Sequence, residues 1–172
     1  MYIKSLKIFS LLLLAVLSVN AQRSNIVIGP EINLPSGNST NRSAIGFGGY
    51  LKGEVGLSEK FSITGSGGLA SFLGKKFMGQ RAATLSFLPV KAGLKFYTES
   101  SFYFEGQLGA SLPLNGTAKT AFAWSPGAGT FIKSRNSNNQ LDIGFRYEGW
   151  TTSDSNTSFG FFSLRAGYAF NL

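Results

Sequence analysis

The sequence of 172 residues contains no cysteine and no histidine. The lack of cysteine excludes disulfide bonds, thiolate metal sites and a lipid-modified N-terminal cysteine. The lack of histidine excludes a histidine-based catalytic triad or zinc site and leaves the serines without their usual catalytic base. Charged residues make up only 14% of the chain, against roughly 25% in an ordinary soluble domain. We therefore expect no catalytic, metal or cofactor-binding residues.

Long apolar runs are scarce as well. The main one, residues 8–19, follows Lys4 and Lys7 and leads into Val19-Asn20-Ala21. It is shorter than the roughly 20 residues that a membrane-spanning helix needs. A basic start, a short apolar segment and small residues at its end are typical of a signal peptide. We expect residues 1–21 to be a signal peptide and residues 22–172 to form one domain.

Apolar residues recur at every second position in most of the remaining sequence, which is the pattern of strands with one apolar face. The clearest runs are 26–34, 45–57, 61–69, 90–96, 102–112, 141–147 and 162–172. Residues 120–134 form a further strand whose apolar parity is unclear, which we attribute to a bulge at Pro126. The sequence therefore predicts eight strands.

The connections between these strands alternate in length. Short turns at 58–60, 99–101 and 136–139 alternate with mostly longer loops at 35–43, 73–81, 113–119 and 152–158. Membrane barrels have such short periplasmic turns and longer extracellular loops. We predict an all-β fold, an eight-stranded antiparallel up-and-down transmembrane β-barrel with four loops outside the cell.

The charged residues of the strands lie on the face opposite the apolar one. Five are acidic and five are basic: Glu31, Lys52, Glu54, Lys91, Lys95, Glu105, Asp142, Arg146, Glu148 and Arg165. A narrow, dry lumen requires such a balance, because an unpaired buried charge is costly. The balance favours a membrane barrel over a soluble lipocalin-like barrel, whose apolar face would line a ligand cavity.

Five of these residues form the candidate site, a lumenal charge network of Glu105, Asp142, Arg146, Glu148 and Arg165. We interpret its carboxylates as ion-pair partners rather than as a catalytic pair. Because the last two strands are sequence neighbours, we expect Glu148 and Arg165 to meet through a cross-strand or diagonal contact.

The predicted outer loops are basic. They carry Arg42, Lys75, Lys76, Arg81 and Lys119 against the single acidic residue Asp154. Phosphates of lipopolysaccharide in an outer leaflet attract such bases, so we interpret these five residues as lipopolysaccharide contacts. No nucleic-acid partner is expected, because the bases form no stripe with stacking aromatic residues.

Six large apolar residues fall on the lumenal parity near the outer ends of their strands: Phe72, Leu85, Phe87, Trp150, Phe159 and Phe161. We favour β-bulges that switch the parity, with Pro89 as the candidate for one strand. The alternative is an apolar plug or a small hydrophobic pocket at the outer mouth.

The segment Leu88-Pro89-Val90-Lys91-Ala92-Gly93-Leu94-Lys95-Phe96-Tyr97 resembles a strand of the small outer-membrane β-barrel family of Gram-negative bacteria, the OmpA/OmpX-type barrels. Residues 141–148 and 165–170 are similar to the last two strands of that family. The resemblance implies a location in the outer membrane and no particular activity.

We therefore expect a non-enzymatic structural or interaction scaffold with a filled lumen. Its partners would be outer-membrane lipid and the barrel insertion machinery, and it would be a monomer. A barrel that binds a small apolar ligand or lipid is one alternative, and a narrow channel is the other.

Overall fold

The computed structural model describes residues 24–41, 43–77, 80–81, 83–98, 101–116, 118–133, 139–152 and 158–172. The predicted signal peptide, residues 1–21, lies outside these ranges and stays a prediction. Within the described ranges, no helix is long and apolar enough to cross a membrane.

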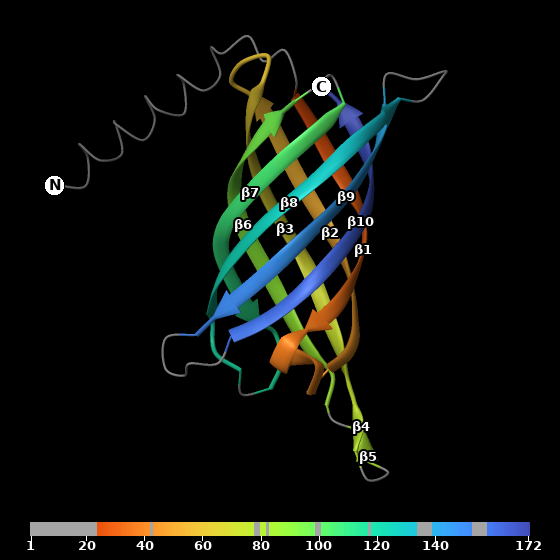
Figure 1. The fold of residues 1–172 in the computed structure, drawn as a ribbon, viewed down its shortest axis with the longest axis vertical. Coiled ribbons are helices and arrows are strands. Elements are labelled where there is room, and N and C mark those ends of the chain that lie inside the picture. The colour runs from red at the N-terminus through yellow and green to blue at the C-terminus, as the bar shows by residue number, and fades with distance from the viewer. Residues whose placement is uncertain are drawn as a thin grey trace, which may run out of the picture.

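Eight long strands close into one antiparallel barrel (Figure 1). Their order is β1-β10-β9-β8-β7-β6-β3-β2, and β2 pairs with β1 to complete the circle. The bounds are β1 Ser24–Ser36, β2 Ser43–Gly56, β3 Phe61–Gly74, β6 Leu85–Tyr97, β7 Phe102–Pro113, β8 Ala121–Lys133, β9 Gln140–Thr151 and β10 Ser158–Asn171. Consecutive long strands are neighbours, so the predicted up-and-down fold is confirmed.

The two ends of the barrel differ. The end that holds the C-terminus carries the short connections, and we call it the turn end (Figure 1). The opposite loop end carries the 3-10 helix η1 (Gly37–Asn41) and a small hairpin of β4 (Lys76–Phe77) and β5 (Gln80–Arg81). This hairpin lies within the predicted loop 73–81, and β3 continues into that loop as far as Gly74. At η1, the Ser39 hydroxyl accepts a hydrogen bond of 2.9 Å from the Gly160 amide.

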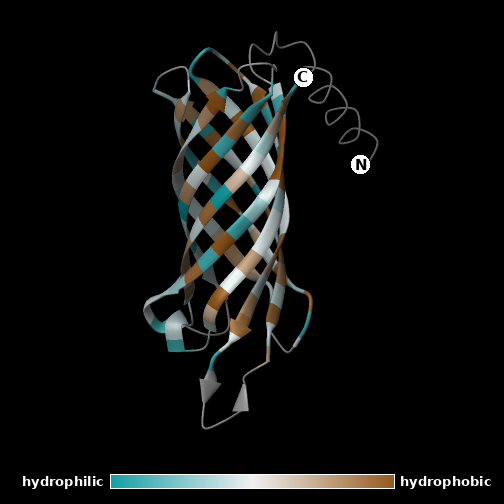
Figure 2. Cartoon of the chain, turned by 90° about the vertical axis from the view of Figure 1, so that its right-hand side faces the viewer, coloured by the Kyte–Doolittle hydropathy of each residue, from teal (hydrophilic) through white to brown (hydrophobic). Residues whose placement is uncertain are grey.

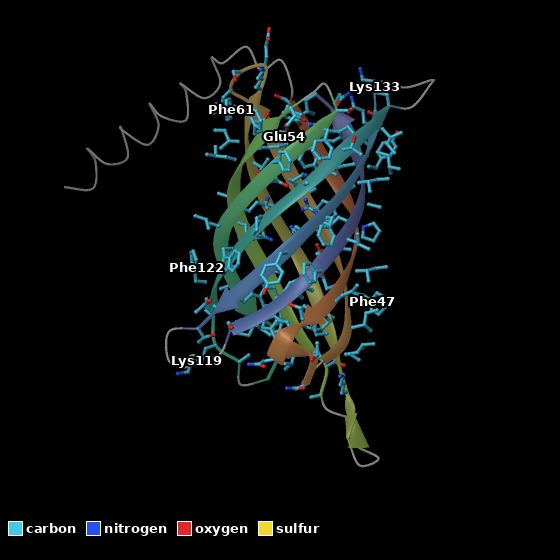
Figure 3. All side chains as sticks on the ribbon, in the orientation of Figure 1. Phe47, Glu54, Phe61, Lys119, Phe122 and Lys133 are labelled. Atoms are coloured by element: carbon cyan, nitrogen blue, oxygen red, sulfur yellow. The ribbon has the colours of Figure 1, made fainter. Side chains whose placement is uncertain are left out.

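The outer surface of the barrel is apolar along all eight strands. Figure 2 shows hydrophobic and hydrophilic residues alternating along the strands that face the viewer, and Phe47 and Phe122 in Figure 3 are about half exposed. Soluble monomers rarely expose apolar surfaces of this extent. In a bilayer the same surface faces hydrocarbon, and closure of the barrel pairs the backbone groups that would otherwise be unsatisfied. The polarity is therefore that of a membrane-spanning barrel.

The predicted bulge at Pro126 is wrong. β8 pairs with β7 in one continuous register, and its pairing with β9 keeps the same register on both sides of Pro126. Odd-numbered residues of β8 face the lumen from Ala121 to Phe131, whereas Phe122, Trp124 and Ile132 face outward. The parity was hard to read because the inward positions hold mainly alanine, serine and glycine.

The two tryptophans of the chain lie on opposite faces of the barrel wall, so their fluorescence can show which face contacts lipid. Trp124 is 37% exposed on the outer surface, whereas Trp150 is 3% exposed inside the barrel. We expect lipids with brominated acyl chains to quench the fluorescence of Trp124 strongly and that of Trp150 weakly, because quenching requires contact. The variants Trp150→Phe and Trp124→Phe isolate the two signals, and equal quenching would contradict this orientation.

Candidate functional site

The ten charged residues predicted to be lumenal all lie inside the barrel, and each is at most 5% exposed. They are arranged as two alternating chains of four residues and one separate pair. Each unit contains equal numbers of acids and bases, so the lumenal charge is balanced locally as well as overall.

The first chain is Asp142–Lys52–Glu105–Arg165. Lys52 Nζ lies 2.8 Å from Asp142 Oδ2 and 3.7 Å from Glu105 Oε2. Glu105 Oε2 in turn lies 3.1 Å from Arg165 Nη2. The four residues come from β9, β2, β7 and β10, so the chain spans the lumen and links strands that are not neighbours.

The second chain is Glu31–Arg146–Glu148–Lys91. Arg146 Nη2 donates a hydrogen bond of 2.8 Å to Glu31 Oε2. Arg146 Nε lies 2.8 Å from Glu148 Oε1, as an ion pair without hydrogen-bond alignment. Lys91 Nζ donates to the same Glu148 oxygen. Arg146 thus bridges two carboxylates, and among the described residues it is the one cation that forms an ion pair with Glu31.

The remaining pair is Glu54 and Lys95, from β2 and β6. Glu54 also accepts hydrogen bonds from Tyr97 Oη at 2.5 Å and from Asn25 Nδ2 at 3.4 Å. The Lys95 ammonium lies 4.2 Å from the centroid of the Tyr103 ring, which is a cation–π contact.

All five predicted network residues take part in these chains, but the expected contact between Glu148 and Arg165 is wrong. The register sets Glu148 opposite Phe161 and Arg165 opposite Gly144. Arg165 reaches across the lumen to Glu105 instead. The sequence interpretation also left the partners Glu31, Lys52 and Lys91 out of the site, although their parity had marked them as lumenal.

An aromatic layer lies inside the barrel toward the turn end. It consists of Val27, Tyr50, Tyr97, Tyr103, Phe131 and Ala169. Tyr103 Oη donates a hydrogen bond of 2.5 Å to Asp142 Oδ1, and Tyr97 donates to Glu54 as described. The layer is therefore joined to the charges by the hydroxyl groups of its own rings.

A second apolar layer, which we call the outer plug, lies inside the barrel toward the loop end. Its members are Ala70, Phe72, Ala121, Ala123, Trp150 and Phe161, with Phe87 and Phe159 packed against them. The Phe72 ring lies 4.9 Å from that of Phe159, 5.0 Å from that of Phe161 and 5.9 Å from that of Trp150. Trp150 Nε1 donates a hydrogen bond of 2.9 Å to Glu148, which joins the plug to the second chain.

The outer plug contradicts the favoured explanation of the lumenal aromatic residues by bulges. β6 keeps a single register with β7 across Pro89, and Pro89 itself faces the lumen. Phe87 consequently lies on the lumenal side without any switch of parity, and Leu85 is partly buried. The one register shift along β2 and β3 lies between Ser43 and Ile45, on the loop-end side of the pair Gly46–Phe72, and β3 keeps its inward parity through Phe72.

Two inward-facing glycines of β8 make room for large lumenal side chains. A Cβ at Gly129 would lie 2.4 Å from Tyr103 Oη, and a Cβ at Gly127 would lie 2.7 Å from the Cβ of Arg146. Larger residues at either position would displace a member or a partner of the charge chains. β8 therefore contributes space to the network rather than charge.

The predicted lipopolysaccharide contacts are only partly described. Lys75 and Lys119 are exposed at the loop end. Lys76 and Arg81 occupy directly opposite positions of the β4–β5 hairpin. Arg42 lies outside the described residues. The structure thus gathers four of these bases at the loop end and leaves their role as a proposal.

No family model matches the chain, and no curated protein matches it. Solved structures do match. Neisserial surface protein A has a TM-score of 0.62 at 14% identity, over 89% of this chain and 99% of that one. Ail, the attachment invasion locus protein of Yersinia pestis, has a TM-score of 0.55 at 21% identity, over 86% and 98%.

The outer membrane protein OprG from Pseudomonas aeruginosa matches with a TM-score of 0.51 at 10% identity, over 88% of this chain and 98% of that one. At these identities the likeness concerns the fold. Together with the closed topology and the apolar outer surface, it gives this chain the fold of the small eight-stranded outer-membrane β-barrels, the OmpA/OmpX-like class.

Proposed function

We propose that the chain is a non-enzymatic scaffold of the outer membrane, with a closed lumen and four loops presented to the cell exterior. The observation that supports this most is the layered lumen, in which paired charges lie between two aromatic layers. Eight strands leave an interior just wide enough for side chains. Such a barrel holds its loops in place without offering a path for solutes.

Planar bilayers containing the purified barrel test the closed lumen. We expect no steady stepwise current from the wild-type protein, because both aromatic layers and the charge chains occupy the interior. Regular unit conductance in the wild-type protein would instead support the narrow channel.

A second candidate is a barrel that binds a small apolar ligand at its outer mouth. It is favoured by Phe87 and Phe159, which are only partly buried on the outer plug. Native mass spectrometry of the purified protein distinguishes the two candidates. A scaffold should carry no specific apolar ligand, whereas a binder should carry a defined mass that Phe159→Ala removes.

The proposal places the loop end outside the cell and the turn end in the periplasm. Because the native chain has no cysteine, single cysteines report this orientation without background. We expect Lys76→Cys to react with an impermeant maleimide in whole cells. Glu59→Cys, in the exposed turn before β3, should react only after lysis. The reverse pattern would overturn the orientation.

We further propose that exposed bases at the loop end contact phosphates of lipopolysaccharide, and that the barrel is monomeric and inserted by the barrel assembly machinery. Lys75 follows directly after the end of β3 at the loop end, where we expect the lipid headgroups to lie. Lys75→Glu with Lys119→Glu should weaken lipopolysaccharide binding in a salt-dependent way, whereas Lys60→Glu at the turn end should not.

A further inference from the structure

The outer surface differs from one side of the barrel to the other. Four outward rings on three adjacent strands form a continuous aromatic strip: Trp124 of β8, Phe145 and Tyr147 of β9, and Phe162 of β10. The ring centroid of Tyr147 lies 5.5 Å from that of Trp124 and 5.2 Å from that of Phe162. The ring centroids of Phe145 and Phe162 are 5.5 Å apart. Elsewhere on the described outer surface, close ring contacts are confined to pairs such as Phe61–Phe96 and Tyr168–Phe170.

Two glycines hold the strip close to the barrel wall. A Cβ at Gly149 would lie 2.4 Å from the indole of Trp124, so this ring covers the backbone of β9. A Cβ at Gly160 would lie 2.3 Å from Tyr147 Oη and 3.4 Å from Ser36 Oγ, so the two hydroxyl groups approach the same point on β10. The strip is thus a preformed apolar surface with hydroxyl groups at its edge toward the loop end.

The position of the strip points to the chemistry of its ligand. β8 begins at the loop end, and Trp124 is its fourth residue. Lys119 is exposed two residues before the strand begins. Figure 3 shows Lys119 farther toward the loop end than Phe122, at the level where headgroups would lie. Lys119 and the outward ring of Phe122 thus precede Trp124 at the loop end of β8, and the hydroxyl groups of Tyr147 and Ser36 lie over Gly160 near the loop end of β10.

We propose that the aromatic strip binds one phosphorylated, multiply acylated glycolipid of the outer leaflet, the lipid A part of lipopolysaccharide. This inference rests on the proposed outer-membrane location and extends the proposed phosphate contacts to a specific site. Lys119 pairs with a phosphate, the hydroxyl groups of Tyr147 and Ser36 bond to the polar backbone of the lipid, and the rings contact its acyl chains. Because lipid tails are as apolar as the rings, the preference arises from close packing and hydrogen bonds.

Native mass spectrometry with purified lipid A added to the detergent-solubilised barrel tests the site. We expect a single bound lipid A, and Trp124→Leu combined with Tyr147→Leu should weaken its binding about tenfold, which corresponds to about 1.4 kcal/mol. Phe104→Leu is the matched control, because Phe104 is a half-exposed outward ring outside the strip. It should bind lipid A like the wild type. Tyr147→Phe, which keeps the ring, should show an intermediate loss.

Heat-modifiable migration in gels shows that each variant is folded, so loss of binding cannot be mistaken for loss of structure. Equal binding by the strip variants and the wild type would overturn the site, as would equal affinity for lipid A and phosphatidylglycerol. Recovery of the wild-type protein as a soluble periplasmic monomer would overturn the proposed function itself, so the two failures are distinguishable.

Discussion

Arg146→Ala is expected to lower the free energy of unfolding by about 4 kcal/mol, within the range for breaking a buried ion pair. Arg146 bridges Glu31 and Glu148 inside the lumen. Glu148 would keep Lys91 and Trp150 as partners, but among the described residues Glu31 would keep only the hydrogen bond from Asn33 Nδ2 at 3.1 Å. Equilibrium urea unfolding in lipid vesicles measures the loss, and exposed Lys60→Ala should change stability by no more than about 0.5 kcal/mol.

Double-mutant cycles test whether the two chains are separate units. Arg165 should couple with Glu105 by at least about 0.5 kcal/mol, because they are in direct contact. Arg165 should couple only weakly with Glu148, which belongs to the other chain.

If Arg146→Ala proved as mild as Lys60→Ala, water would be solvating the carboxylates that lose Arg146 as their partner. The lumen would then be hydrated, and the channel would become the better interpretation.

The eight strands could be predicted from the sequence because each strand separates two very different environments. Leu94 and Phe96 face lipid, and Lys95 between them is fully buried in the lumen. A one-residue shift of register would exchange these environments, so the alternation is strongly marked. β8 was the exception, because its inward positions Gly127 and Gly129 have no side chains whose polarity could mark the lumenal face.

The pairing inside the lumen could not be predicted in the same way. Parity assigns Lys52 and Asp142 to the interior, but these residues are 90 positions apart in the chain and lie on strands that are not neighbours. Their meeting depends on the tilt and stagger of the closed barrel. Glu148 and Arg165 were expected to pair because their strands follow each other in the chain, but the register of β9 and β10 separates them.

The outer plug shows that the lumen is lined by apolar rather than charged side chains near the loop end. Counting along the strands placed Phe72 and Trp150 in the lumen correctly, but a bulge was favoured because apolar residues were expected only outside. Near the loop end, an apolar lumenal layer borders the second charge chain, because Trp150 Nε1 donates a hydrogen bond to Glu148. Low exposure then strengthens each ion pair, because the local dielectric constant is low.

Phe72→Ala is therefore expected to destabilise the barrel by about 4 kcal/mol, within the range for truncating a buried phenylalanine. Phe72 is 1% exposed and contacts the rings of Phe87, Trp150, Phe159 and Phe161, so its loss leaves a cavity at the centre of the plug. Phe72→Leu should recover much of the stability, because it refills most of that volume. Urea unfolding in vesicles measures both variants. A loss below about 1 kcal/mol for Phe72→Ala would mean that the rings repack freely, as in a loosely filled mouth, and would favour the apolar-ligand binder over the closed scaffold.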